Sequence, residues 1–386
     1  ITGEEKDSTR GRANSLRLAM SGQLGPNAMT SKEMLETMKL CVSCKACKRE
    51  CPTSVDMSAM KLEVMALNTQ QNSLSLHDRL VAYLPDYAPV ASSFSKILNL
   101  RNSSKIFAKL SEYFAGFSAK RDLPLWRNNW FRNNEIPSYP DGQYPIVLFV
   151  DTFNRYFEPE NLRSAVRVLK NAGYYPFYPE PKQKKQKPLC CGKTHLSVGN
   201  ITKARQAAGR LVETYLPYAK KGLPIVGLEP SCLLALKDEI PSLLKTKDAK
   251  LVSKYVMTFE ELLSQDKKSL NLKPLRAKAL LHGHCHQKAF NVLGSVEEVL
   301  GFIKDLKVEK IETSCCGMAG SFGYSKETYD FSMKMAEKDL LPKIREADKN
   351  TILIADGTSC RSQIVDGSER EAIHVARLLD QQLLNN

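Results

Sequence analysis

The sequence predicts a multidomain α+β protein in which a helical N-terminal module precedes a duplicated α/β unit. Two observations lead to this prediction. Four cysteines lie close together within residues 41–51, between segments with helical patterning. From residue 144 onward, strand-like apolar segments alternate with helical ones, and an adjacent pair of cysteines followed by glycine occurs twice, at 190–192 and 315–317.

The length and composition of the chain are those of a globular protein. A length of 386 residues favours two or three domains, and 42% hydrophobic and 25% charged residues are ordinary values. The eleven cysteines are grouped, which favours metal binding in a reducing compartment over disulfides. No apolar run approaches the roughly 20 residues that span a membrane. We therefore expect a cytoplasmic protein, with peripheral association at the inner face of the membrane as an alternative.

The chain starts at Ile1, without a methionine or a signal peptide, so we expect a fragment or a trimmed chain. Its net charge of +14 would suit nucleic acid, but the lysines and arginines are spread along the chain and no recognition motif accompanies them. We expect no nucleic-acid binding and instead a basic face toward an acidic partner or an anionic membrane surface. The lysines at 182, 184, 185 and 187 predict a solvated loop, with steering of an anionic substrate as the minority view.

Residues 1–72 predict an α-helical module. One helix is expected to begin at Thr30, because Thr30-x-x-Glu33 is a capping-box pattern. Its apolar face leads into the cysteines, and a further helix is expected after Pro52.

The cysteine run itself has the spacing C-x-x-C-x-x-C-x-x-x-C-P, which is typical of bacterial ferredoxins whose thiolates hold 4Fe–4S clusters. Zinc sites instead pair C-x-x-C with a distant second pair. We therefore predict an iron–sulfur site in a ferredoxin-like module. In two-cluster proteins the fourth cysteine of this pattern ligates the other cluster. The predicted ligands are Cys41, Cys44, Cys47 and Cys51.

Residues 73–143 predict a helical connector that packs on its neighbours. Trp126, Trp130 and Phe131 lie among arginines near its end. Because exposed aromatic residues with arginine are typical of interfaces, a docking surface for a partner or a membrane is the alternative.

The remaining chain predicts two α/β units, a first unit at 144–270 and a second unit at 271–386. The alternation of elements favours largely parallel sheets with helices on their faces. Expected strands are 146–150 and 224–228 in the first unit and 277–281 and 351–354 in the second, with helices at 201–215 and 327–341.

Each unit places a Cys-Cys-Gly turn and a later Ser-Cys near the carboxyl ends of strands, where open α/β sheets build their sites. Glycine after the paired cysteines allows a tight bend. The second unit has four thiols, enough for a cluster, whereas the first has three and carries Asp151 and Thr152 near the position that matches Cys285. The first unit is therefore expected either to lack a cluster or to borrow a ligand from its neighbour. The candidate ligands are Cys190, Cys191 and Cys232, and then Cys285, Cys315, Cys316 and Cys360.

Three histidines surround Cys285. His282, His284 and His286 alternate, so His284 is expected to point away from the other two if the strand continues. A metal or proton role for one of them and simple hydrogen-bonded packing both stay open.

At these motifs the chain resembles a known family. The Cys-Cys-Gly repeats resemble the cysteine-rich (CCG) domain of heterodisulfide reductase subunits, of the glycolate oxidase and anaerobic glycerol-3-phosphate dehydrogenase iron–sulfur subunits, and of lactate-utilisation proteins. The fuller pattern resembles the C-terminal half of bacterial FAD-linked D-2-hydroxyacid dehydrogenases of the D-lactate or D-2-hydroxyglutarate type. It comprises residues 8–13, 41–52, 151–153, 229–232 and 284–286.

The resemblance implies an oxidoreductase component that transfers electrons. FAD in a domain upstream, or in a separate subunit, would take a hydride from the hydroxy acid, and the clusters would relay electrons to a quinone or an electron-transfer protein. In that family another ferredoxin motif precedes the stretch at 8–13, and here the chain begins after it, so Cys51 would serve that other cluster. These residues contain no dinucleotide fingerprint, so we expect no FAD in this chain and no activity without the flavin domain.

Two other functions stay open. A heterodisulfide-reductase-like enzyme would carry out thiol/disulfide chemistry, but neither unit has the C-x-x-C ending of those proteins. A zinc-binding interaction module would use the same cysteines without redox chemistry.

Overall fold

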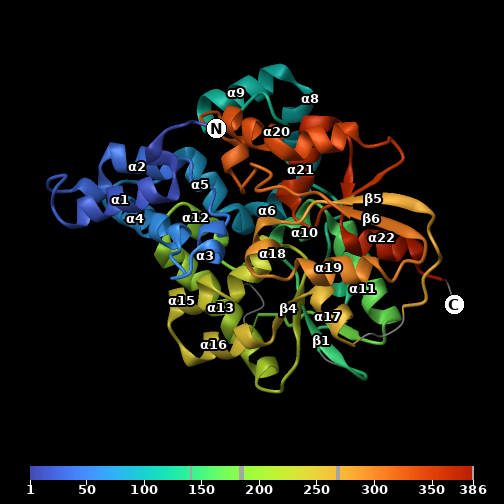
Figure 1. Cartoon of the computed structure of the whole chain (residues 1–386). Coiled ribbons are helices and arrows are strands. Elements are labelled where there is room, and N and C mark those ends of the chain that lie inside the picture. Colours follow the sequence, from blue (N-terminus) through green and yellow to red (C-terminus); the bar gives the residue numbers. More distant parts are fainter. Residues whose placement is uncertain (140, 182–186, 267–269, 385–386) are drawn as a thin grey trace.

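A computed structural model describes residues 1–139, 141–181, 187–266 and 270–384. It combines a helical N-terminal module, a helical connector and two parallel sheets with helices around them (Figure 1). The predicted mixed α/β fold with parallel sheets is thus confirmed. Of the lysine-rich loop before Cys190, the positions 182, 184 and 185 lie outside the described residues.

The N-terminal module packs its helices around an apolar core that includes Met34, Met38 and Met57. Its second helix begins at Lys32, because the Ser31 side chain accepts a hydrogen bond from the backbone N–H of Met34 at 3.2 Å. The predicted start of this helix at Thr30 was therefore wrong, since Thr30 precedes the capping residue Ser31. The helices are α1 (Thr9–Met20), α2 (Lys32–Lys39), α3 (Ala46–Glu50) and α4 (Met57–Gln71), with short 3-10 helices at Glu5–Asp7 and Ala28–Thr30.

The connector is helical in its first half and irregular after it. Trp126 and Trp130 are half-buried against Tyr156 and Phe157 of the first unit, and Phe131 is buried. The alternative that these aromatic residues form an exposed docking surface was therefore wrong. The connector helices are α5 (Leu76–Ala82), α6 (Leu84–Ser93), α7 (Ser95–Leu98), α8 (Leu100–Ser103) and α9 (Lys105–Ala115), and a 3-10 helix follows at Asn133–Glu135.

The first unit contains a four-stranded parallel sheet in the order β2-β1-β3-β4. Its strands are β1 (Pro145–Phe149), β2 (Tyr175–Phe177), β3 (Ile225–Gly227) and β4 (Val256–Thr258). Its helices are α10 (Thr152–Tyr156), α11 (Pro159–Asn171), α12 (Lys193–Ser197), α13 (Ile201–Ala219), α14 (Pro230–Leu233), α15 (Glu239–Leu244), α16 (Lys247–Lys254) and α17 (Phe259–Asp266), with a 3-10 helix at Leu234–Leu236.

The second unit contains a parallel sheet in the corresponding order β6-β5-β7-β8. Its strands are β5 (Ala277–Leu281), β6 (Leu306–Lys310), β7 (Ile352–Ile354) and β8 (Ala372–Ile373). Its helices are α18 (Cys285–Ala289), α19 (Leu293–Leu300), α20 (Tyr329–Glu346), α21 (Thr358–Ser368) and α22 (Val375–Gln382), with a 3-10 helix at Phe322–Tyr324. The four predicted strands appear in the two units, and each observed end lies within one residue of the predicted end.

The two units share one apolar core and contact each other reciprocally. Helix α11, which follows the first strand of the first sheet, packs on α22, which follows the last strand of the second sheet. Helix α19, in the place of α11 within the second unit, packs on α17, in the place of α22. Leu281, Val296 and Leu379 belong to the same buried cluster as the first sheet. Reciprocal pairs of this kind are what a two-fold relation between similar units produces.

Candidate metal centres

The cysteine loop, residues 41–51, is shaped by two residues with left-handed backbone. Ser43 has φ 52° and Lys45 has φ 60°, a conformation that curls the chain between consecutive cysteines. Helix α3 then starts at Ala46 and places Cys47 within its first turn. Cys41 and Cys47 pack against the apolar core of the N-terminal module.

Cys44 lies beside other thiols, and Cys51 does not share that environment. Burial raises the pKa of Cys44 to about 11, and the thiols of Cys285, Cys41 and Cys47 add to this because they disfavour another negative charge nearby. The pKa of Cys51 is instead lowered, first by a contact of its Sγ with Thr53 Oγ1 at 3.2 Å. The structure thus brings Cys41, Cys44 and Cys47 together and leaves Cys51 in a different environment.

The four thiols of the second unit form a chain of contacts, in which Cys285 is half-buried and the other three are buried. Cys285 contacts Cys315, which contacts Cys316, which contacts Cys360. Cys285 begins α18, Cys315 and Cys316 form the turn after β6, and Cys360 lies in the first turn of α21. The pKa of Cys285 is raised, first by the hydrogen-bonding contact with the Cys315 thiol and then by burial, which disfavours a charged thiolate. The contact with Cys285 lowers the pKa of Cys315, but the contact with Cys316 and burial raise it overall.

His282 is the histidine that faces these thiols. One of its ring nitrogens lies within 4.8 Å of the sulfurs of Cys316 and Cys360. Its Nδ1 lies 3.1 Å from Thr313 Oγ1, whereas its Nε2 has no hydrogen-bond partner although the residue is buried. A buried nitrogen without a partner beside the thiols of Cys316 and Cys360 fits a metal-binding site better than simple packing in an apolar core.

The alternation of the three histidines was expected only if the strand continued, and this condition is not met because strand β5 ends at Leu281. His284 instead caps α18, where its Nδ1 accepts a hydrogen bond from the backbone N–H of His286 at 3.1 Å. His286 turns toward the cysteine loop, with its Nε2 lying 3.2 Å from the carbonyl oxygen of Ser43. This contact joins the second unit directly to the loop, next to Cys44.

The three thiols of the first unit have a similar arrangement with one replacement. Cys190 contacts Cys191, which contacts Cys232, and all three are buried. The side chain of Thr152 hydrogen-bonds Cys190. Thr152 begins α10 directly after the capping residue Asp151, as Cys285 begins α18 directly after His284. A hydroxyl therefore stands in the first unit where the second has a thiol.

Both Cys-Cys-Gly turns depend on glycine for the same reason. Gly192 has φ 82° and Gly317 has φ 85°, and a Cβ would lie 2.9 Å from the carbonyl oxygen of Ala204 or 2.4 Å from that of Ser332. In each turn the glycine N–H donates to the first cysteine sulfur, at 3.3 and 3.4 Å. The paired cysteines are thus held by the same backbone geometry.

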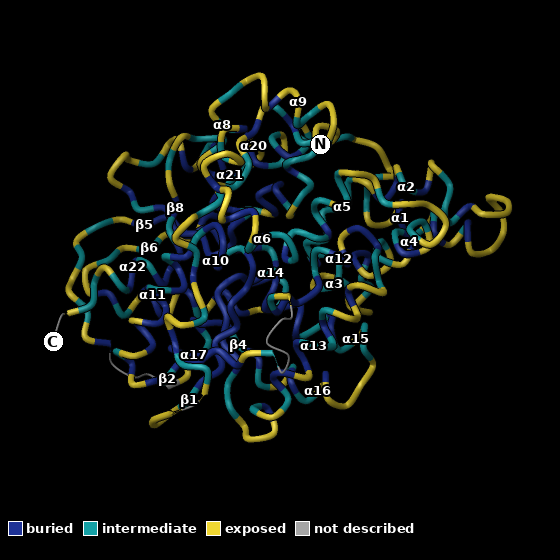
Figure 2. Tube along the Cα trace, turned by 180° about the vertical axis from the view of Figure 1, so that it is seen from behind, coloured by how far each residue is buried: buried dark blue, intermediate teal, exposed yellow. Residues whose placement is uncertain are grey.

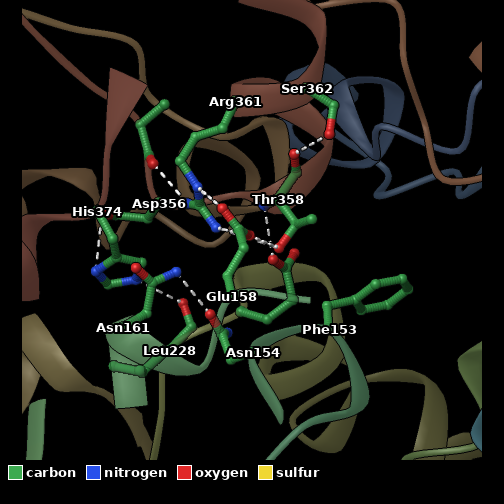
Figure 3. Close-up of polar contacts among 12 residues, drawn as sticks. Phe153, Asn154, Glu158, Asn161, Leu228, Asp356, Thr358, Arg361, Ser362 and His374 are labelled. Atoms are coloured by element: carbon green, nitrogen blue, oxygen red, sulfur yellow. Dashed lines mark hydrogen bonds and ion pairs between the residues drawn. The ribbon is translucent and has the colours of Figure 1, made fainter. Parts of the chain in front are cut away.

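A charged network of buried Arg361 and half-buried Glu158 lies between the two units and was not predicted from the sequence. Arg361, the residue after Cys360, donates from Nε to Glu158 of the first unit at 2.7 Å, and Thr358 Oγ1 donates to the same carboxylate (Figure 3). Burial alone would raise the pKa of Glu158, but the guanidinium of Arg361 holds it below its usual range. The backbone N–H of Thr358 also donates to Glu229, three residues before Cys232, at 2.9 Å. Both cysteine groups therefore lie along the same boundary between the units.

His374, Asp356 and Glu260 form another close group at this boundary. His374 Nδ1 accepts from the backbone N–H of Ala376 at 3.0 Å, so its Nε2 carries the proton that faces the carbonyl oxygen of Leu228 at 3.2 Å (Figure 3). Because both ring nitrogens are engaged, we interpret this group as hydrogen-bonded packing between the units.

The lysine in the cysteine loop connects it to the first unit. Lys45 Nζ is buried and lies 2.6 Å from Asp238, 3.5 Å from Glu239 and 3.1 Å from Asp56. Burial would lower the pKa of Lys45, but these carboxylates raise it overall. Little in the sequence indicates these buried ion pairs, since a lysine is ordinarily exposed to solvent.

Comparison with known proteins agrees with this arrangement at the level of the domain. Residues 152–237, which run from Thr152 through Cys232 in the first unit, match the model of the family described as "Cysteine-rich domain" (CCG). The first unit is therefore similar to cysteine-rich domains of the CCG type.

Three similar curated proteins bear out the resemblance. The chain is 24% identical over 354 residues to D-2-hydroxyglutarate dehydrogenase of Escherichia coli K12, a match covering 86% of this chain and 33% of that protein. It is 26% identical to a subunit of the anaerobic glycerol-3-phosphate dehydrogenase of the same organism, covering 80% and 78%. It is 23% identical to a probable glycolate oxidase iron-sulfur subunit of Bacillus subtilis 168, covering 97% and 88%. The predicted resemblance is confirmed, and the chain spans about a third of the length of the D-2-hydroxyglutarate dehydrogenases it matches.

Among the described residues, no helix is both long and apolar enough to cross a bilayer.

Proposed function

We propose that this chain is the iron–sulfur electron-transfer part of an FAD-linked D-2-hydroxyacid dehydrogenase. The FAD-binding domain, upstream in the same polypeptide or in a separate subunit, would oxidise the hydroxy acid. This chain would pass the electrons to an acceptor such as a quinone or an electron-transfer protein. The proposal rests on the resemblance to dehydrogenases and iron–sulfur subunits and on the arrangement of the thiols.

The observation that carries the proposal is the contact between the two cysteine groups. His286 reaches the carbonyl oxygen of Ser43, and the thiol of Cys285 is among the groups that raise the pKa of Cys44. A ferredoxin-type loop and a four-thiol group in contact suit a relay in which electrons move one at a time.

The residues of the second unit fit an iron–sulfur cluster. Four thiols that contact one another in sequence supply the soft donors that iron–sulfur clusters prefer, and His282 adds an unpartnered nitrogen close to two of them. When bound, a 4Fe–4S cluster supplies one-electron redox chemistry. Cys285, Cys315, Cys316 and Cys360 would hold it. Lys288 Nζ donates to the carbonyl oxygen of Thr313 at 2.7 Å, close enough to the thiols to offset part of their negative charge.

The cysteine loop fits a second cluster through Cys41, Cys44 and Cys47, with Cys51 assigned to a different cluster by the cross-over rule. In the first unit, Cys190, Cys191 and Cys232 with Thr152 offer three thiols and a hydroxyl. We assign no cluster to this set.

Two alternatives remain in competition. A heterodisulfide-reductase-like enzyme would need a disulfide substrate at the second unit, and a zinc-binding interaction module would be colourless. A relative named as an iron-sulfur subunit favours iron over zinc. We propose a cytoplasmic location, with the acceptor deciding whether the chain works at a membrane.

The experiment is an assay of the anaerobically reconstituted chain with D-lactate, D-2-hydroxyglutarate and an artificial dye, with and without an added FAD-binding domain. Removing a hydride needs an acceptor that takes two electrons together, which flavin provides. We expect dye reduction only with the FAD-binding domain, and less of it when Cys316→Ser replaces the wild-type chain. Turnover by the flavin-free chain alone would contradict the proposal.

A further inference from the structure

The connector presents an apolar surface that nothing in the described chain covers. In α9 the apolar residues 106, 107, 110, 113 and 114 recur at the spacing of a single helix face. That face points to solvent, since Ile106 is 71% exposed, Phe114 67% and Tyr113 79%, whereas Ala108 on the other side is buried. An amphipathic helix normally packs its apolar face against the protein interior. An exposed apolar face of this kind therefore indicates a surface that binds a partner or a membrane.

The exposed face continues onto the neighbouring helices. Helices α8 and α9 lie at the outer edge of the molecule, and much of their trace is exposed (Figure 2). We define the apolar patch as the exposed residues Val90, Phe94, Ile97, Leu98, Leu100, Ile106, Phe107, Leu110, Tyr113 and Phe114.

The charges around the apolar patch are predominantly positive. Lys96, Lys105, Lys109 and Lys326 are exposed beside it, and no described ion pair joins any of them to a carboxylate. The nearby carboxylates are engaged elsewhere. Glu112 accepts a hydrogen bond from the backbone N–H of Ala119, Glu327 pairs with Lys39, and Asp330 pairs with Lys120.

We propose that the apolar patch docks this protein on the surface of an anionic lipid bilayer. Apolar and aromatic side chains on one face of a helix, with lysines along its margin, match a helix that lies in the plane of the headgroups. Each lysine near an anionic surface adds attraction, and four of them flank the patch. A protein partner fits this surface less well, because protein interfaces are depleted in lysine. Membrane docking depends on this surface alone and stands whether or not the proposed function holds.

The test is co-sedimentation of the full chain with phosphatidylcholine vesicles, with and without phosphatidylglycerol. We expect binding to the phosphatidylglycerol vesicles that weakens as salt rises. The triple variant Ile106→Ser/Phe107→Ser/Phe114→Ser should bind at least about tenfold more weakly, since three large apolar side chains no longer enter the lipid. The charge variant Lys105→Glu/Lys109→Glu should lose the preference for phosphatidylglycerol.

The matched control is Met20→Ser/Leu24→Ser/Val365→Ser, which removes three exposed apolar side chains away from the apolar patch and should bind like wild type. Far-UV circular dichroism checks that every variant is folded. Wild-type protein that stays in the supernatant, or a patch variant that sediments like wild type, would overturn the proposal. So would light scattering that shows a dimer through the apolar patch, together with no vesicle binding.

Discussion

The two α/β units have the same sheet order and the same turn geometry but different sets of cysteines. Each Cys-Cys-Gly turn uses a left-handed glycine whose N–H donates to the first sulfur. Yet the residue that begins the helix after the first strand is Thr152 in the first unit and Cys285 in the second. Backbone geometry and the number of thiols are thus separable, because the first unit keeps the backbone frame of the second and lacks one of its thiols.

The units also differ in how they hold the cysteine loop. The first unit meets it through charges, because Lys45 lies beside Asp238 and Glu239 of that unit, with Asp56 of the N-terminal module also close. The second meets it through the neutral contact of His286 with Ser43, beside the thiols. The ion pairs of Lys45 therefore attach the cysteine loop to the first unit. The contact of His286 with Ser43 lies on the proposed route of electrons between the loop and the second unit.

The largest expected difference between the units is in iron content. Replacing Cys316 with Ser should remove most of the iron of the second unit after anaerobic reconstitution, because it removes the middle thiol of the chain of contacts. Cys191→Ser is the matched control, at the same place in the other turn, and should leave the iron content close to wild type. Iron and sulfide analysis measures both. An unchanged iron content in the Cys316→Ser variant would contradict the assignment of Cys316 as a cluster ligand.

A fourth thiol restored to the first unit tests whether the number of thiols alone separates the two units. Thr152→Cys should let the first unit bind additional iron, because Thr152 already contacts Cys190 from the position that Cys285 occupies in the second unit. Iron per chain should rise above wild type. Ser in place of Thr152 is the control and should bind no more than wild type. A rise that failed to appear would show that more than the thiol count separates the two units.

A smaller effect is expected on stability from the charged side of the loop. Lys45→Met should cost about 3–5 kcal/mol in the free energy of unfolding, because it leaves Asp238, Glu239 and Asp56 close together without their buried cation. Urea unfolding measures this. Lys48→Met, in which a half-exposed lysine also near Asp238 is removed, should cost at most about 1 kcal/mol. Equal effects of the two variants would mean that burial of Lys45 is not what matters.

The smallest expected effect is the pH dependence of the same attachment. The pKa of Lys45 is raised, so its contribution is fully present below the ordinary lysine value of about 10 and is lost above it. Burial alone would raise the pKa of Asp238, but Lys45 and Lys48 lower it, so its contribution is present above about pH 4 and fades as pH falls. The cost of Lys45→Met should therefore be constant near neutral pH and shrink below about pH 4. If the loss in the free energy of unfolding caused by Lys45→Met grew as the pH fell below about 4, this predicted direction would be contradicted.

Sequence reasoning located the elements whose signals are local. The strand at Ala277–Leu281 was predicted at its observed bounds, and the Cys-Cys-Gly turns were recognised as matching points of the two units. Strands such as β8 (Ala372–Ile373) were missed because two residues carry no periodicity. The division into 1–72, 73–143, 144–270 and 271–386, the duplication and the complete ligand sets stay predictions.

Contacts between distant residues were out of reach from the sequence. Nothing local distinguishes Lys45 from a solvated lysine, and its partner Asp238 lies 193 residues away in the chain. The sequence left two interpretations open for Trp126, packing on a neighbour or an exposed docking surface, because its packing against Phe157 depends on the tertiary fold. The outward face of α9 gave the normal amphipathic pattern, and only the fold reveals that it is uncovered.

The central claim is that the second unit holds a redox-active iron–sulfur cluster and the first does not. Electron paramagnetic resonance of the anaerobically reconstituted, dithionite-reduced chain tests it most directly. We predict a signal from the reduced cluster of the second unit, in addition to that of the cysteine loop. Cys316→Ser should remove the second-unit signal and leave the loop signal, and Cys191→Ser should keep both. A colourless protein that binds zinc, or a signal that both variants alter equally, would contradict the account.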